Sequence, residues 1–166
     1  KQWIIVFISL CLAGISIALA FSFRTVDEPV LLSYLKGACF AGSVSAIFII
    51  LGIIVPAYKL LPAGYYTINY PALLRAMCKV IGVQLFGKVI VFLFYNKQKI
   101  KATYFGGMQE KLQAFITKTE RNEFGHLAPF VLLSGICIYL VDIHRSVYVP
   151  AIMIFNTLIN LYPVLL

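Results

Sequence analysis

The sequence predicts an all-α integral membrane protein, with four transmembrane helices and a basic amphipathic helix at the membrane interface. Hydrophobic residues make up 61% of its 166 residues and charged residues only 12%, whereas a soluble domain is about 45–50% apolar and about 25% charged. Several apolar runs are long enough to cross a bilayer, and most Lys and Arg residues fall in one segment between them. A chain of this length forms one domain, so residues 1–166 are assigned to a single membrane domain.

The predicted spans follow from hydrophobic runs of about 20 residues, the length that crosses a bilayer at about 1.5 Å per residue. The first run contains Ala18-Leu19-Ala20, which resembles a signal-peptide cleavage site, but the run is longer than a signal-peptide core. The second carries Lys36 near its start, which can snorkel towards the headgroups. The four spans are expected near residues 3–23, 30–55, 124–142 and 147–166.

Small residues gather on one part of the second span. Such residues let helices approach closely in a membrane, where packing drives association. We expect this face to pack against another helix, and residues 37–43 also offer a surface for an oligomer. The residues concerned are Gly37, Ala38, Ala41, Gly42 and Ser43.

The segment 73–96 is too polar for an easy span and too apolar for a solvated helix. It sets Arg75, Lys79 and Lys88 among long apolar side chains. This pattern is typical of a helix that lies along the cytoplasmic face of a membrane. A full span for part of it, near residues 80–95, stays open as the alternative.

The distribution of charge predicts the orientation in the membrane. Cytoplasmic loops are rich in Lys and Arg and lie close to anionic headgroups. The segment from Lys59 to Arg121 should therefore face the cytoplasm of a plasma membrane, with both termini on the same side. Because long apolar runs separate the cations, membrane lipids are the expected partners and nucleic acid is not. Ten of the 14 basic residues lie in that segment: Lys59, Arg75, Lys79, Lys88, Lys97, Lys99, Lys101, Lys111, Lys118 and Arg121.

A charged motif, "TERNEFGHLAP" at residues 119–129, stands at the mouth of the third span. On a helix, Thr119, Glu123 and His126 share one face. A carboxylate beside an imidazole is the arrangement of a general base and its orienting group, and ionisable groups at membrane depth tend to be functional. The alternative is a solvated helix end with interfacial charges. No metal is expected, because a di-iron site needs two Glu-x-x-His copies and the other histidine, His144, belongs to the opposite side.

Asn156 and Asn160 face the same way in the last span, four residues apart. Amide side chains in hydrocarbon need hydrogen-bond partners. They either tie helices together or line a polar cavity with Glu123 and His126. The last two spans are joined by a short loop, so residue 160 returns to about the depth of residue 126. Ser134 is expected to bond back to its own helix.

The stretch "FITKTERNEFGH", followed by "NLYPVLL" about 30 residues later, resembles the glycosyl-diaponeurosporenoate acyltransferases of staphyloxanthin-type carotenoid synthesis. The resemblance covers about residues 105–166. The family pattern is Thr-x-Arg-x-Glu-x-x-His, then a span, then an Asn shortly before a Pro. The matching residues here are Thr119, Arg121, Glu123, His126, Asn160 and Pro163.

The resemblance implies transfer of a fatty acyl group to a hydroxyl of a lipid-embedded acceptor, such as a glycosylated isoprenoid. His126 would take the hydroxyl proton and Glu123 would hold the imidazole. Arg121 would bind the anionic end of an acyl carrier, and Thr119, Asn156 and Asn160 would contact substrate. No cofactor is implied beyond an activated donor such as an acyl thioester. The alternatives are a non-catalytic membrane subunit, a lipid-binding or assembly protein, or an oligomeric transporter.

Overall fold

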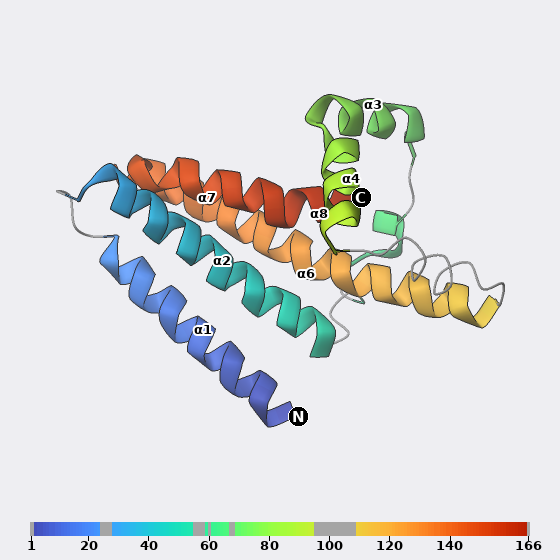
Figure 1. The fold of residues 1–166 in the computed structure, drawn as a ribbon, viewed down its shortest axis with the longest axis horizontal. Coiled ribbons are helices and arrows are strands. Elements are labelled where there is room, and N and C mark those ends of the chain that lie inside the picture. The colour runs from blue at the N-terminus through green and yellow to red at the C-terminus, as the bar shows by residue number, and fades with distance from the viewer. Residues whose placement is uncertain are drawn as a thin grey trace.

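The computed structural model describes residues 2–23, 28–54, 59, 61–66, 69–94 and 109–165, and its regular elements there are helical. Helices α1 (Gln2–Ser22), α2 (Val30–Ile54) and α6 (Gln109–Asp142) lie side by side with a composite last helix (Figure 1). That helix consists of α7 (Val149–Asn156), the π-helical turn η4 (Thr157–Leu161) and α8 (Tyr162–Leu165). A 3₁₀ turn, η3 (Ser146–Tyr148), connects α6 to α7.

Four helical stretches are long and apolar enough to cross a membrane: Trp3–Ser22, Val30–Gly52, Asn122–Asp142 and Ser146–Leu165. They coincide with the four predicted spans to within about three residues. Each stretch has the length that the hydrocarbon core of a bilayer requires. The prediction of an all-helical fold with four helices long and apolar enough to cross a membrane is therefore confirmed.

Helix α6 is much longer than its apolar part. Its 34 residues extend about 51 Å, against about 30 Å for a hydrocarbon core. Its N-terminal part accordingly projects past the other helices in Figure 1. Pro129 lies inside this helix and does not end it. The helix ends at Asp142, and His144, two residues later, has a left-handed φ of 59°, a common conformation just after a helix.

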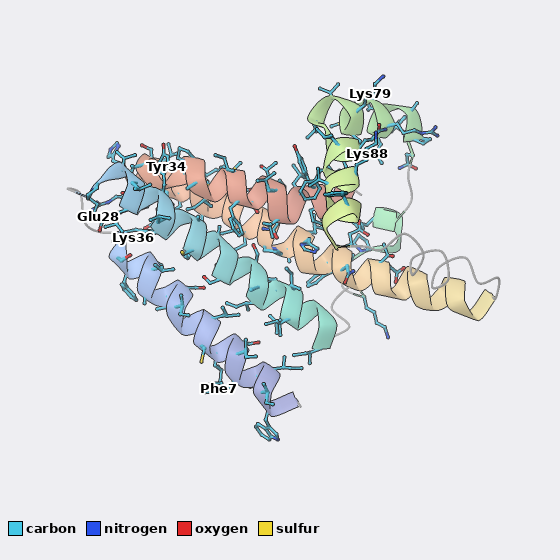
Figure 2. All side chains as sticks on the ribbon, in the orientation of Figure 1. Phe7, Glu28, Tyr34, Lys36, Lys79 and Lys88 are labelled. Atoms are coloured by element: carbon cyan, nitrogen blue, oxygen red, sulfur yellow. The ribbon has the colours of Figure 1, made fainter. Side chains whose placement is uncertain are left out.

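The buried core is densest where the turn from α6 to α7 meets α1 and α2. The Phe23 ring stacks on Tyr148 at 4.2 Å and meets Phe40 edge-on at 5.3 Å. At this end of the molecule Glu28 forms an ion pair with Lys36 (Figure 2). The Tyr148 hydroxyl donates to the same carboxylate. Lys36 thus pairs with Glu28, whereas the sequence suggested that its ammonium group would reach towards the headgroups.

The small residues of α2 are used for packing within the chain. A Cβ on Gly37 would lie 3.0 Å from the Tyr148 carbonyl oxygen, and one on Gly42 would lie 3.3 Å from the Phe155 ring. On the other side, the hydroxyls of Ser43 and Ser16 form a hydrogen bond of 2.7 Å that ties α2 to α1. Small side chains therefore allow α2 to contact two neighbours closely.

The predicted single helix over residues 73–96 is wrong in one respect, because Gly82 divides it. Gly82 adopts φ +80° and separates α3 (Pro71–Ile81) from α4 (Val83–Phe94). The two helices have 11 and 12 residues, about 16–18 Å each, and neither is long enough to cross a bilayer. An interfacial position for this segment stays a prediction.

The α3–α4 corner is attached to the end of the last helix. The Tyr162 hydroxyl donates to the Ile81 carbonyl oxygen at 2.8 Å, and the Phe86 and Tyr162 rings meet edge-on at 4.8 Å. Val83 is buried in the same contact region. Figure 1 accordingly shows α4 beside α8, with α3 running across it. This attachment brings the basic segment to the end of the bundle that carries the charged motif.

Candidate functional site

The site forms where α2, α6 and the last helix meet, and Gly125 sets how closely they approach. Gly125 is buried, and a Cβ there would lie 3.3 Å from the Cα atom of Ile49. The backbones of α2 and α6 therefore contact each other with no side chain between them. His126, the next residue, is half-buried at this junction.

His126 adjoins the last helix at two points, the Asn160 side chain and the Ile159 backbone. The sequence explains why Ile159 is available. In α-helical register its carbonyl would accept from residue 163, but Pro163 has no N–H. The chain there forms the π-helical turn η4, a feature that often occurs at functional sites. The last helix thus presents the Asn160 side chain and the Ile159 backbone to His126.

Asn156 and Asn160 belong to one hydrogen-bonded network inside the bundle. Both side chains are 0% exposed. The Asn156 amide donates to the Phe130 carbonyl oxygen at 3.1 Å and to Ser134 Oγ at 3.3 Å. The Asn160 amide donates to Ser45 Oγ at 2.8 Å and to Asn156 Oδ1 at 2.9 Å. These bonds connect α2, α6 and the last helix at the depth of the candidate site.

The two donors of Asn160 are both engaged, which fixes the orientation of its amide. Its remaining polar atom is Oδ1, and an amide has only two N–H hydrogens. In the part of the chain that the structure describes, the buried side-chain atoms without a hydrogen-bond partner are Asn160 Oδ1 and His126 Nδ1. Buried polar atoms are seldom left unpaired. Two such atoms on adjoining side chains mark this junction as the most unusual polar feature of the described bundle.

Glu123 lies one turn before His126 and has a different partner. Its Oε1 atom accepts a hydrogen bond of 2.8 Å from the Tyr65 hydroxyl. Tyr65 belongs to the 3₁₀ turn η2 (Ala63–Tyr66). Among the described residues Glu123 forms no hydrogen bond with His126. Helical spacing brings the two side chains to one face. The Glu123 carboxylate nevertheless bonds to Tyr65 of the η2 turn.

Thr119 and Arg121 lie further towards the N-terminus of α6. Thr119 is exposed on this extension, and the side chain of Arg121 lies outside the described residues. Within the described part of the chain, no group of three His, Cys, Asp or Glu residues could hold a metal ion. The structure therefore brings His126, Asn160 and Asn156 together, and places Glu123 beside Tyr65.

Two contacts of the site were not anticipated from the sequence. Ser45 is one serine in an apolar span, and Tyr65 lies in the stretch between the second span and the segment 73–96. The position of Ser45 deep inside the second span could have indicated such a contact, because a hydroxyl inside a membrane span needs a hydrogen-bond partner. No pattern around Tyr65 indicates that its hydroxyl reaches Glu123.

The fold and this junction define a class: a helical protein with four membrane-span-length helices and a buried polar site between three of them. The comparison with known families is more specific. The family model for glycosyl-4,4'-diaponeurosporenoate acyltransferases matches residues 62–166, more than half of the chain. The chain belongs to this family. No curated protein and no solved structure matches the chain.

The extent of the match corrects the sequence-based estimate. The family match begins at residue 62, whereas the resemblance found in the sequence covers about residues 105–166. It therefore includes Tyr65 and the α3–α4 corner as well as the motif and the last span. Helices α1 and α2 precede it. Ser45 and Ile49, which contact Asn160 and Gly125, thus come from outside the matched region.

Proposed function

We propose that this protein is a membrane acyltransferase in which His126 acts as general base. The reaction moves a fatty acyl group from an activated donor to a hydroxyl of a lipid-embedded acceptor. The observation that carries the proposal is the contact of His126 with Asn160, whose two amide hydrogens are both used elsewhere. The family match supplies the reaction class.

The first step of the proposed mechanism is selection of a tautomer. Asn160 can offer only an oxygen to the imidazole, so an imidazole that carries its hydrogen on Nδ1 is the form that fits. Nε2 then has a free lone pair. Because Nδ1 is buried while His126 as a whole is half-buried, the accessible part of the ring lies away from Nδ1. A histidine held in this way is ready to accept a proton from substrate.

The second step is direct transfer. The acceptor hydroxyl gives its proton to Nε2, and its oxygen attacks the acyl carbonyl carbon of the thioester. The carbon–sulfur bond breaks, and the thiolate takes the proton back from the imidazolium. The products are an ester and a free thiol, and the histidine returns to its starting state. Among the described residues beside His126 none supplies an obvious nucleophile, so the proposed mechanism uses direct transfer without a covalent acyl-enzyme.

Asn160 takes the orienting role that the motif spacing suggested for Glu123. In this proposal Glu123 and Tyr65 instead hold the η2 turn against α6 near the site. Arg121 and the lysines of the basic segment attract the anionic part of the donor. Thr119 lies on the donor side of the site, and Asn156 supports Asn160 while lying close to the substrate.

An apolar groove supports a lipid-embedded acceptor. It lies between α2 and the last helix and has a volume of about 380 Å³. Its lining residues are Leu31, Tyr34, Leu35, Ala38, Ala151, Ile154, Phe155, Leu158 and Ile159. Its last residue, Ile159, is the one whose backbone adjoins His126. A hydrocarbon chain in this groove would run along the bilayer and bring its polar end towards the imidazole. Such a groove suits a long isoprenoid or acyl chain.

The proposed location is the plasma membrane, with both termini and the basic segment in the cytoplasm. This orientation follows the charge bias of residues 59–121. It puts His126 near the cytoplasmic boundary, where a soluble acyl donor is available. The α3 helix would then lie on the cytoplasmic surface, with Arg75 and Lys79 near the headgroups.

A non-catalytic subunit is the second candidate, and the hydrogen-bonded network favours it. The amides of Asn156 and Asn160 connect three helices, which is also what a structural network does. Lipid and pigment mass spectrometry separates the two functions. An acyltransferase predicts an acylated lipid in cells with the wild-type protein and its loss with His126→Ala. A subunit predicts the same lipids with both.

A further inference from the structure

A second apolar cavity lies at the end of the bundle opposite His126. It has a volume of about 580 Å³ and is formed by residues of α1, α2 and α6 together with Arg145. Along α6 this end is about 24 Å from His126, taking about 1.5 Å per residue to Asp142. The cavity is thus a separate site, near the other membrane boundary. Its walls include Ile17, Phe21, Ile136 and Tyr139.

Among the described residues that line this cavity, Arg145 is the charged one. It is half-buried. Its backbone is held in place, because its N–H donates to the Leu140 carbonyl oxygen at 2.7 Å directly after the left-handed residue His144. The Arg145 side chain therefore starts from a fixed backbone position at the edge of an otherwise apolar wall.

No acidic residue in the described part of the chain forms an ion pair with Arg145. At this end of the bundle the Glu28 carboxylate is engaged by Lys36 and by the Tyr148 hydroxyl. Asp142 is exposed on the last turn of α6 and makes no contact with the guanidinium. A half-buried cation against hydrocarbon is costly unless an anion pairs with it. An anionic ligand in the cavity would supply such a pairing.

We propose that this cavity binds one anionic phospholipid, with its phosphate on Arg145 and an acyl chain between α1 and α6. Arginine binds phosphate with two parallel hydrogen bonds. The apolar walls suit a hydrocarbon chain, and a phospholipid carries a phosphate and such a chain in one molecule. A soluble anion would satisfy the guanidinium but leave the apolar walls empty. The lipid satisfies both, and the site is independent of the acyl transfer proposed for His126.

The test uses a phosphatidylglycerol that carries a diazirine in its acyl chain, incorporated into nanodiscs with the full-length protein. Illumination cross-links the chain to nearby residues, and mass spectrometry measures the yield on α1 and α6 peptides that line the cavity. The wild-type protein should cross-link there, and the matched phosphatidylcholine probe should give a clearly lower yield. Millimolar inorganic phosphate should not compete with the phosphatidylglycerol probe.

Variants then test the two halves of the site. Arg145→Gln should lower the yield about fivefold, the value of one Arg–anion contact at a membrane surface, and Arg145→Lys should retain most of it. Ala20→Phe, which fills the cavity, should abolish the cross-links. Lys79→Gln on the exposed α3 helix is the matched control and should leave them unchanged. The proposal is overturned by equal yields for wild type and Arg145→Gln, by equal yields for the two lipids, or by competition from phosphate.

Discussion

Asn160 lies against His126 with only its carbonyl oxygen free, because Ser45 and Asn156 accept both of its amide hydrogens. This contact joins α2, α6 and the last helix at one point, and in the proposed mechanism it selects which imidazole nitrogen carries the proton. In this proposal Ser45 on α2 holds the Asn160 amide in one orientation, and the Asn160 oxygen in turn orients the His126 ring. Substitution of these residues, and of the glycine that allows their close packing, tests each contact.

Replacement of Asn160 should affect turnover more than replacement of Asn156. Asn160→Ala removes the oxygen that faces His126, so turnover should fall about 10–100-fold, less than the loss of the base itself. Asn156→Ala leaves one amide hydrogen of Asn160 unpaired but removes no atom that contacts the imidazole, so its loss of turnover should be smaller. Both should lower the stability by about 1–2 kcal/mol. Acyl transfer and thermal unfolding in detergent measure the two effects. Equal losses of turnover would assign both residues to the structural network.

Ser45→Ala should act at a distance through Asn160. It leaves one amide hydrogen unpaired, so the amide is free to rotate and the imidazole loses its orienting group. We expect a drop in turnover of about fivefold, the equivalent of about 1 kcal/mol. Ser43→Ala is the matched control, because Ser43 bonds to Ser16 on α1 and has no contact with the site. A Ser45→Ala protein with wild-type turnover would show that α2 does not hold the amide.

Tyr65 and Glu123 should behave as one unit. Tyr65→Phe deletes the hydroxyl that donates to the carboxylate, and Glu123→Gln removes the charge while keeping an acceptor oxygen. Each change should reduce turnover without abolishing it. Because the two groups share one bond, the double variant should be scarcely worse than either single variant, with a coupling energy of about 1 kcal/mol. Additive losses in this cycle would mean that Glu123 acts apart from Tyr65.

Alanine substitutions at two glycines of α6 should change the stability of the protein in opposite directions. Gly125→Ala puts a Cβ 3.3 Å from the Ile49 backbone, so α2 must move and the protein should lose about 1–3 kcal/mol. Gly135→Ala meets nothing within 4 Å and should gain up to about 1 kcal/mol, since alanine favours helix. Thermal unfolding in detergent compares them directly. A stable Gly125→Ala protein would contradict the close approach that positions His126.

Much of this architecture could be predicted from the sequence. The spans depend on hydrophobic length, which is a local property, so their bounds were found to within about three residues. The division of residues 73–96 at Gly82 was missed, because a glycine inside an apolar pattern indicates a break only when its φ is positive. The depth match of residues 126 and 160 followed from helical rise and a short connection.

The partners of the site residues could not be predicted in the same way. Helical spacing places Glu123 and His126 on one face, but it does not decide which group each side chain meets. Those partners come from elements distant in sequence, Tyr65 for Glu123 and the Ile159–Asn160 pair for His126. Pro163 gave a usable signal, since a missing N–H leaves a carbonyl free four residues earlier. That signal was interpreted only as part of a family pattern.

The most direct test of the account is the turnover of His126→Ala with a defined donor and acceptor. Purified protein in nanodiscs is given a fatty acyl thioester and a glycosyl-4,4'-diaponeurosporenoate, the acceptor that the family name indicates, and mass spectrometry follows the acylated product. The account predicts that the wild-type protein forms this product and that His126→Ala forms it about 10²–10⁴-fold more slowly, with unchanged helix content. Equal rates for the two proteins would contradict the role of His126 as general base.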